Sequence, residues 1–323
     1  MSSSSLRARN SAPGGEARQR RPRMSLPRPT RKSAQQNLVA YTFLAPWLVG
    51  IFGLTLGPML ASLYLSFTEF DLFTSPEWVG IENYRWMLFE DRRYMQSLRV
   101  TVTYVLVSVP LKLVFALMVA IILNRGLRGL TVYRAVYYLP SLLGGSVAVA
   151  IMWRQLFSRD GVVNALLGVI GIEGPSWISN PDYALYTLIV LSIWQFGSPM
   201  VIFLAGLRQI PQDLYDASAV DGAGKISQFV RITIPLLTPI IFFNLLMQMI
   251  GAFQAFTSSY VVSGGTGGPA DSTLFYTLYL YQQGFTQFRM GYAAAMAWVL
   301  LTIIAIATAF SFLSSRFWVH YGD

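Results

Sequence analysis

The chain has 323 residues, of which 54% are hydrophobic, 14% aromatic and 12% charged, and it contains no cysteine. This balance is typical of a membrane protein, and the lack of cysteine excludes a disulfide framework, a thiol nucleophile and a thiolate metal site. The formal charge of +9 is mostly local, because residues 1–32 hold nine Lys or Arg residues against Glu16 alone.

Residues 1–37 form the first segment, which is rich in Ser, Arg and Pro and has no apolar periodicity. Such a segment cannot bury a core, so we expect a disordered, basic cytoplasmic tail. We expect its positive charge to contact anionic membrane lipid, with no nucleic acid as a partner. The apolar run that begins at Leu38 is too long for the h-region of a cleaved signal peptide.

Six apolar segments are long enough to cross a hydrocarbon core, which takes roughly 20 residues each. They lie at residues 38–67, 100–123, 135–153, 183–207, 233–262 and 290–312. Two further runs, residues 161–172 and 272–288, are predicted to be interfacial segments. Lys112 is the one charged residue inside the spans, just after a predicted kink at Pro110. The sequence therefore predicts an all-α polytopic membrane protein with six transmembrane helices.

The orientation follows from the Lys and Arg residues in short loops. With the tail inside, the inner segments hold 16 of these residues and the outer segments seven, and Lys112 completes the 24. Without the nine residues of the tail the two sides are level, so the assignment depends on the tail and on the even number of spans. We expect both termini in the cytoplasm, including a short C-terminal segment at residues 317–323, and residues 211–235 on the same side.

Residues 211–235, PQDLYDASAVDGAGKISQFVRITIP, form a long polar segment between two apolar spans. Pro211 suits the first turn of a helix and Asp213 meets the positive end of its dipole, so a short helix is predicted to begin here. Four residues recur at three- and four-residue spacing and share one narrow face: Leu214, Ala217, Ser218 and Asp221. Gly222 and Gly224 then interrupt the helix, and Asp221 is the predicted N-cap of a second helix that ends near Pro235.

The same residues also fit a solvated helical hairpin that merely links two spans. A phosphate-binding loop is excluded, although residues 222–227 resemble one. Ala219 stands where that motif needs its first glycine, and Ile226 stands where it needs Ser or Thr. No nucleotide site is therefore expected in this loop.

Residues 216–235 resemble the EAA loop, the signature of the membrane-spanning subunits of binding-protein-dependent ABC importers. The match consists of DAS from Asp216, DGA from Asp221, nine residues from Ala223 to Arg231, and ITIP ending at Pro235. The departures keep charge and size, with Asp216 for the usual Glu, Ser218 for the usual Ala and Ile234 for the usual Leu. The resemblance covers nearly the whole chain from Leu38 onward, including residues 80–84 and 133–140.

The resemblance implies an ABC importer type I permease core at residues 38–316, in the maltose-permease-like carbohydrate family of bacterial plasma membranes. In that family the loop is a coupling helix that sits in a groove of a separate ATPase subunit, which uses ATP and Mg, while the permease binds no cofactor. The implied coupling residues are Leu214, Asp216, Ala217, Ser218, Asp221, Gly222, Ala223 and Pro235. The implied partners are a second homologous permease, an ATPase dimer and an extracytoplasmic solute-binding protein, which would contact the outer loops at residues 71–91 and 263–272.

Polar residues inside the spans are candidates for the substrate pathway, because unpaired polar groups in hydrocarbon are costly and face the bundle interior. The candidates are Ser141, Gly145, Trp194, Gln195, Asn244, Gln248, Gly251, Phe253 and Gln254. Uncharged amides and hydroxyls beside aromatic rings suit a sugar, and the resemblance places Ser141, Gln195, Gly251 and Gln254 near sugar contacts. Bonds to a neighbouring helix would explain the same residues. The lack of a charge in this set favours a neutral sugar, with an acidic sugar or glycerol phosphate as alternatives.

No catalytic constellation or metal site is found in the sequence, so an enzyme is not expected. His320 is the single histidine, no paired carboxylates lie within a span, and no G-x-S-x-G motif occurs. An ion-driven secondary transporter would need intramembrane carboxylates, and the predicted spans contain no Asp or Glu. A scaffold subunit explains the spans but not the pattern at residues 216–235. The resemblance therefore implies one half of the translocation pathway of an ATP-driven sugar importer, with an ion-driven secondary transporter as the alternative.

Overall fold

The structure is a computed structural model that describes residues 31–124 and 129–320, and the chain divides into two units after Pro58. The first unit holds α1 (Arg31–Val49), the π-helical η1 (Gly50–Leu56) and the start of α2 (Gly57–Leu65). The chain runs as one apolar helix over Val39–Leu65, long enough to cross a membrane, as predicted for the first span. The helix begins at Arg31, inside the segment predicted to be disordered, and residues 1–30 of that segment lie outside the described residues.

The second unit is mainly helical. Its short hairpin consists of β1 (Thr68–Glu69) and β2 (Glu77–Trp78), which pair antiparallel with Thr68 opposite Trp78. The helices before the coupling loop are α3 (Glu82–Phe89), α4 (Arg92–Asn124), α5 (Leu130–Leu143), α6 (Val147–Leu156), α7 (Val162–Val169), α8 (Pro181–Trp194) and α9 (Gly197–Leu207). The later elements are α10 (Gln212–Val220), α11 (Lys225–Gln228), η2 (Phe229–Thr233), α12 (Ile234–Phe253), α13 (Thr257–Ser263), η3 (Pro269–Asp271), α14 (Tyr276–Tyr281), η4 (Gln282–Thr286) and α15 (Met290–Ser315).

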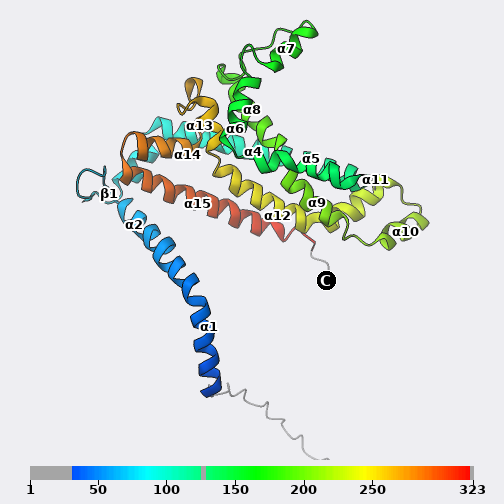
Figure 1. Ribbon diagram of the computed structural model, residues 1–323, viewed down its shortest axis with the longest axis horizontal. Helices are drawn as coiled ribbons and strands as arrows, with labels where there is room; N and C mark the ends of the chain where they lie inside the picture. The colour runs from blue at the N-terminus through cyan, green and yellow to red at the C-terminus, as the bar shows by residue number, and fades with distance from the viewer. Residues whose placement is uncertain (1–30, 125–128, 321–323) are drawn as a thin grey trace, which may run out of the picture. The chain divides into compact units, whose positions relative to one another are not determined.

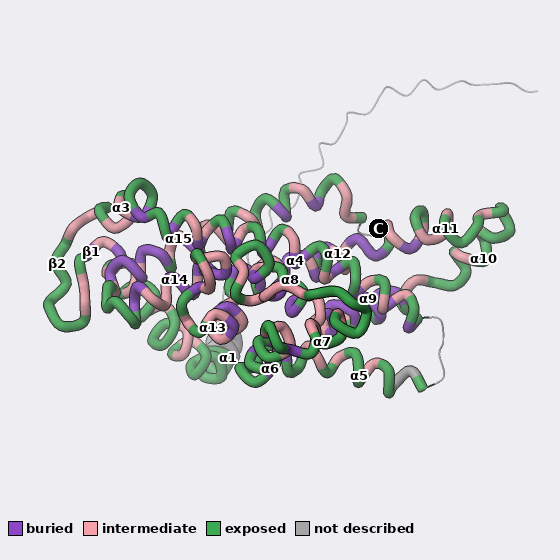
Figure 2. The backbone as a smooth tube through the Cα atoms, turned by 90° about the horizontal axis from the view of Figure 1, so that it is seen from above, coloured by how far each residue is buried: buried purple, intermediate pink, exposed green. Residues whose placement is uncertain are grey.

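Helix α4 is central to the second unit and contacts α8, α9, α12 and α14 (Figure 1). Its 33 residues give a length of about 50 Å, well beyond the roughly 30 Å of a hydrocarbon core. The helix is unbroken through Pro110, where the sequence predicts a kink. Its buried side chains, among them Tyr104, Val109 and Ala116, share one core with residues of α9, α12, α14 and α15, and Figure 2 shows this burial in purple.

Two predicted spans are broken rather than continuous. Residues 135–153 belong to α5 and α6, which meet at 97°, and residues 183–207 belong to α8 and α9, which meet at 41°. Counting each bent pair as one span, the described residues hold six spans, as predicted. The predicted span at residues 233–262 is also interrupted, because α12 ends at Phe253 and α13 begins at Thr257. Hydropathy reports apolar length and not backbone continuity, so these breaks could not be predicted from it.

The run at residues 272–288 packs into the protein core at its centre, and its place at a membrane interface stays a prediction. Leu274, Phe275 and Tyr276 are each 0% exposed. Tyr276 N donates to Thr101 Oγ1 at 2.8 Å, and Tyr276 Oη donates to Met296 O at 2.7 Å. These bonds tie the start of α14 to α4 and α15. Helix α7, in the other such run, has no buried residue, and its place at an interface stays a prediction.

The chain turns back onto α12 after α15. His320 N donates to Thr238 Oγ1 at 2.9 Å, and the rings of Trp318 and Phe242 lie 5.9 Å apart between centroids. The C-terminal segment predicted at residues 317–323 is therefore attached to the bundle over its described part, and residues 321–323 lie outside the described residues.

Candidate substrate cavity and coupling loop

A cavity of about 340 Å³ lies where three helix breaks of the second unit meet. The breaks contribute Gly144, Gly145 and Ser146 between α5 and α6, Gln195 between α8 and α9, and Gln254, Ala255 and Phe256 between α12 and α13. Helix α4 contributes Tyr104, Val109 and Lys112. Non-helical backbone at membrane depth is tolerated where it is buried in protein or lines a water-filled cavity. The three helix breaks and the cavity that they line therefore form one site.

Three glutamine amides and five hydroxyl groups provide the uncharged polar side chains of the cavity wall. Gln195 Nε2 donates to Gly144 O at 2.9 Å, which leaves Gln195 Oε1 available. The amides of Gln248 and Gln254 also line the cavity and have no hydrogen-bond partner among the described residues. Thr257 adds a hydroxyl at the start of α13. The wall thus offers both donors and acceptors to a ligand with several hydroxyl groups.

The cavity brings together five of the nine predicted pathway residues: Gly145, Gln195, Gln248, Gly251 and Gln254. Ser141 lies outside it, where its hydroxyl accepts from Ser198 N at 3.0 Å and donates to Gln195 O at 2.9 Å, fastening α5 to the α8–α9 break. Trp194 packs against Trp153, with ring centroids 6.0 Å apart, and Phe253 is buried in the main core. The part that these residues play in transport stays a prediction.

Asn244 is the fourth predicted pathway residue that lies off the cavity, and it is 0% exposed. Neither Nδ2 nor Oδ1 has a hydrogen-bond partner among the described residues. Asn244, Gln248 and Gly251 follow one another at helical spacing on one face of α12, so Asn244 lies one turn away from the cavity wall. A buried polar group without a partner costs about 1–3 kcal/mol.

Lys112 is the candidate that the sequence analysis left out of the pathway. It is the only charged side chain among the described residues that line the cavity, and no carboxylate stands beside it there. Lys112 thus adds to this cavity wall a charge that the predicted pathway residues lack, and the choice between a neutral and an acidic sugar stays a prediction. A lone charge in an apolar span was visible in the sequence, but the rotation of α4 decides whether that charge faces the bundle interior.

The predicted short helix of the coupling loop is α10, with Pro211 at its N-cap and Asp213 in its first turn. The prediction that Asp221 caps a second helix is wrong. Asp221 is the C-cap of α10, and α11 begins after Gly224, which makes no side-chain cap. The physical reason is that the chain leaves α10 at Gly222 in a left-handed conformation, which separates Asp221 from the next helix.

Helix α10 ends in a Schellman motif, which satisfies two carbonyl groups of its last turn. Ala223 N donates to Ser218 O at 2.9 Å, and Gly222 N donates to Ala219 O at 3.0 Å. Gly222 has φ +80°, the left-handed conformation that this motif requires and that glycine adopts without a steric penalty. The interruption predicted at Gly222 is therefore a defined end of the helix.

The second helix of the loop does not end near Pro235. α11 continues through η2 into α12, and Lys225–Phe253 forms one helix of 29 residues. Pro235 lies inside this helix, two residues after the π-helical η2, so it does not mark a helix end. The coupling loop is thus joined by continuous helix to Gln248 at the cavity.

Hydrogen bonds hold one side of α10 against the helices that follow. Tyr215 Oη and Thr233 Oγ1 lie 2.8 Å apart, and Gln228 Nε2 donates to Tyr215 O at 3.0 Å and to Ser218 Oγ at 2.9 Å. Ser218 is therefore on the inner side of α10 and not on the predicted docking face. The sequence analysis missed Tyr215, Gln228 and Thr233, because nothing in their spacing indicates that they meet.

The other side of α10 is exposed. Leu214 is 43% exposed and Val220 is 88% exposed, and Asp216, Ala217 and Asp221 are also exposed. Apolar and acidic side chains are thus presented together on a surface that no described residue covers.

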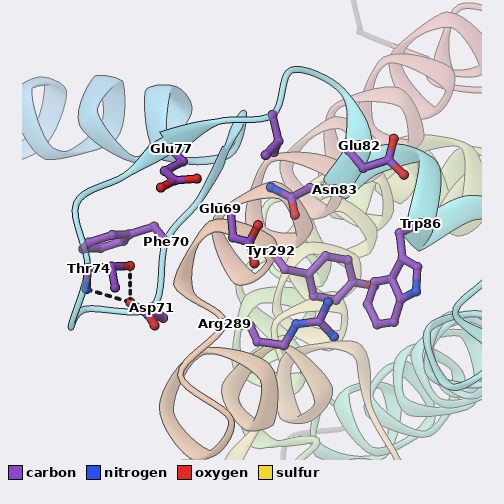
Figure 3. A pocket seen from close by; sticks show the side chains of 11 residues that line it. Glu69, Phe70, Asp71, Thr74, Glu77, Glu82, Asn83, Trp86, Arg289 and Tyr292 are labelled. Carbon is purple, nitrogen blue, oxygen red and sulfur yellow. Dashed lines mark hydrogen bonds between the residues drawn. The ribbon is translucent and has the colours of Figure 1, made fainter.

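Residues 71–91, which were predicted to form an outer segment, contribute to a second cavity, of about 540 Å³, between the β1–β2 hairpin, α3 and the start of α15 (Figure 3). Four carboxylates line it, those of Glu69, Asp71, Glu77 and Glu82. The guanidinium carbon of Arg289 lies 4.1 Å from the centroid of the Trp86 ring. Hydrogen bonds from the backbone N–H and the hydroxyl of Thr74, and from the N–H of Phe73, hold the pKa of Asp71 below its usual value, so this carboxylate is charged at neutral pH.

The glycine-rich loop at residues 263–272 is held by hydrogen bonds from other residues of this chain. Gly264, Gly265, Gly267 and Gly268 all have positive φ. Thr273 Oγ1 donates to Gly267 O at 2.8 Å. Arg93 fixes the far end of the loop, because its Nη2 and Nε donate to the two carboxylate oxygens of Asp271 at 2.7 and 3.0 Å. Contact with a solute-binding protein stays a prediction, and the shape of the loop does not require one.

Asp91 is a buried carboxylate, 7% exposed, directly before α4. Its Oδ2 accepts hydrogen bonds from the hydroxyls of Tyr279 and Tyr292, each at 2.7 Å, and its Oδ1 accepts from Tyr94 N at 3.0 Å. Burial raises the pKa of Tyr279, so this hydroxyl stays a donor. The carboxyl group of Asp91 thus joins the start of α4 to α14 and α15.

Broken apolar helices, a cavity at their breaks and an exposed loop helix connected to the cavity wall define a polytopic membrane permease. The chain belongs to the family described as binding-protein-dependent transport system inner membrane component, whose profile matches residues 89–319. It is 54% identical over 293 residues to the probable ABC transporter permease protein YesP of Bacillus subtilis, covering 90% of this chain and 95% of YesP. It is 34% identical over 285 residues to the lactose transport system permease protein LacF of Rhizobium radiobacter, covering 85% of this chain and 93% of LacF.

The fold also matches a solved structure. A chain of the bacterial alginate ABC transporter, crystallised in complex with an alginate pentasaccharide-bound periplasmic protein, has a TM-score of 0.76 at 20% identity, covering 90% of this chain and 99% of that chain. This likeness confirms the predicted ABC importer permease fold.

Proposed function

We propose that the chain is a membrane-spanning subunit of an ATP-driven importer of sugars or oligosaccharides. The observation that carries the proposal is the cavity at the three helix breaks, whose free amides suit a ligand with many hydroxyl groups. A lactose transport permease among the relatives and an alginate importer with the same fold support this substrate class.

The exposed side of α10 docks into a groove of a separate ATPase subunit, which binds ATP and Mg. The support is the asymmetry of the helix: its inner side is bonded to Gln228 and Thr233, while Leu214 and Val220 are exposed on a cytoplasmic loop in the predicted orientation. Exposed apolar residues gathered on one surface mark interaction sites.

A second homologous permease completes the translocation path, and both termini of this chain lie in the cytoplasm. The β1–β2 hairpin and the loop at residues 263–272 then face outward, where a solute-binding protein delivers the sugar. The acidic cavity of the hairpin and the rigid, hydrogen-bonded glycine loop support this arrangement, because charged, preorganised surfaces favour specific docking.

The mechanism uses the helical connection between loop and cavity. When ATP brings the two ATPase subunits together, α10 moves with them, and the helix over Lys225–Phe253 passes the movement to Gln248 and Gly251. The bundle then opens outward and accepts the sugar, as in rigid-body transitions of other proteins.

Purification in mild detergent through a C-terminal tag, followed by mass spectrometry, tests the assembly. We expect a second six-span permease and an ATPase to co-purify. A chain that elutes alone and monodisperse would contradict the importer proposal and would favour an ion-driven transporter.

A pair of variants tests the docking surface. Leu214→Asp on α10 is expected to release the ATPase and to abolish ATP-dependent uptake, with normal insertion into the membrane. The matched control is Val169→Asp on α7, which changes another exposed apolar residue, 84% exposed, outside the loop. Equal loss of the ATPase in both variants would show that the effect is not specific to α10.

A further inference from the structure

We infer that the importer takes an acidic sugar, and that Lys112 binds its anionic group within the cavity. The inference deepens the proposed function, on which it rests, by naming the substrate class. The first observation is the set of groups in the cavity wall. The described lining residues include one ammonium group and three glutamine amides, and they include no carboxylate.

Lys112 has no ion-pair partner among the described residues. The two ion pairs recorded there, Arg85 with Glu82 and Arg93 with Asp271, belong to the outer segments of the chain. Lys112 instead sits in the middle of α4, where an unpaired charge is costly unless it meets a counter-ion or a water-filled space. A ligand that carries the missing negative charge removes this cost while it is bound.

The surroundings of Lys112 favour an anion over a cation. Gly145 and Ser146 line the cavity at the N-terminus of α6, which carries the positive end of the helix dipole. Gln195, Gln248 and Gln254 are neutral and hydrogen-bond to hydroxyl groups without adding charge. The site therefore combines one positive centre with several uncharged polar groups, as expected for a sugar that carries a carboxylate.

The size of the site also fits. At about 340 Å³, the cavity lies within the roughly 300–1,000 Å³ typical of small-molecule sites. It holds a short saccharide segment, and a charged substituent on that segment needs a specific partner, because an unpaired carboxylate would lose its hydration on entering.

The test uses the assembled transporter in proteoliposomes, with the wild-type solute-binding protein present throughout. The probes are matched trisaccharide pairs that differ only in oxidation at C6: gluco-, galacto- and manno-trisaccharides and the corresponding triuronates, with glycerol 3-phosphate as a separate small anion. ATP hydrolysis and uptake are measured for each probe. We expect stimulation by at least one triuronate and none by its neutral counterpart.

Variants of Lys112 then locate the charge recognition. Lys112→Gln is expected to raise the KM for the active triuronate at least tenfold, and Lys112→Arg to restore most of the affinity. Arg99→Gln is the matched control, because it removes one positive charge from α4 about 20 Å along the same helix. Basal ATP hydrolysis and co-purification of the partner subunits confirm that each variant is assembled.

Three results would overturn the inference, and they separate it from the proposed function. If a neutral trisaccharide stimulates the wild-type transporter and Lys112→Gln leaves its KM unchanged, the protein is a sugar importer that does not recognise charge. Loss of the second permease from Lys112→Gln, with no change in preference between paired probes, makes the lysine an assembly contact. Stimulation by glycerol 3-phosphate alone, or by no probe, contradicts the sugar importer itself.

Discussion

The end of α10 allows a sharp test of the coupling loop through one backbone angle. Gly222 has φ +80°, and a Cβ added there meets no atom within 4 Å. Gly222→Ala therefore changes only the conformational preference of the residue and creates no clash. A non-glycine residue in the left-handed region costs about 1–2 kcal/mol, which lowers the ratio of closed to frayed helix end by a factor of about 5–30.

Hydrogen–deuterium exchange measures this loss directly. The amides of Gly222 and Ala223 donate the two hydrogen bonds of the Schellman motif, so their exchange in the purified permease should accelerate by about 5–30-fold in Gly222→Ala. Uptake should fall as well, because the frayed end no longer holds the docking side of α10 in one geometry.

Gly224 provides the matched control, two residues away. Its φ of −72° and ψ of 164° suit any residue, and an added Cβ again meets nothing within 4 Å. Gly224→Ala should keep or slightly slow the exchange, since it restricts the unfolded chain by about 0.4–1 kcal/mol. Equal acceleration in both alanine variants, or none in Gly222→Ala, would refute the assignment of the motif.

Three further predictions concern the bundle. Gly144→Ala places a methyl group on the side chain of Gln195 and disturbs its 2.9 Å bond to the Gly144 carbonyl, so the bundle should lose about 1–3 kcal/mol of stability; an unchanged melting temperature would contradict this. Asn244→Leu removes two buried unpaired polar atoms, so the free energy of unfolding should increase by about 1–3 kcal/mol and the melting temperature should rise. A lower melting temperature would reveal a partner for the amide. Tyr292→Phe removes one of the two hydroxyl donors to Asp91 Oδ2 and should cost about 1.5–3 kcal/mol in thermal unfolding; an unchanged melting temperature would show that the bond contributes nothing.

The sequence was sufficient to predict the apolar spans and the family. Apolar length identifies a membrane helix, because the hydrocarbon core sets a minimum span, and the pattern at residues 216–235 led to the family that the comparisons confirm. Local chemistry also located the start of α10, where Asp213 occupies the first turn, and its interruption at Gly222.

The sequence was insufficient where tertiary packing decides the outcome. Ser141 and Gln195 are both polar residues in apolar spans, yet Ser141 bonds to backbone across a helix contact and Gln195 lines the cavity. Composition cannot distinguish them, because the difference depends on how α5 is rotated against α9. Lys112 was missed for the same reason, and the breaks after Leu143 and Trp194 were missed because apolar residues continue on both sides.

The unbroken helix over Lys225–Phe253 has a mechanical consequence for the whole assembly. Its 29 residues make a rod of about 44 Å with the coupling loop at one end and the cavity wall near the other. A tilt of about 10° about its middle displaces both ends by about 4 Å in opposite directions. The two ends therefore move by about equal distances, so in the proposed importer a movement of α10 would limit how far this wall of the cavity can move.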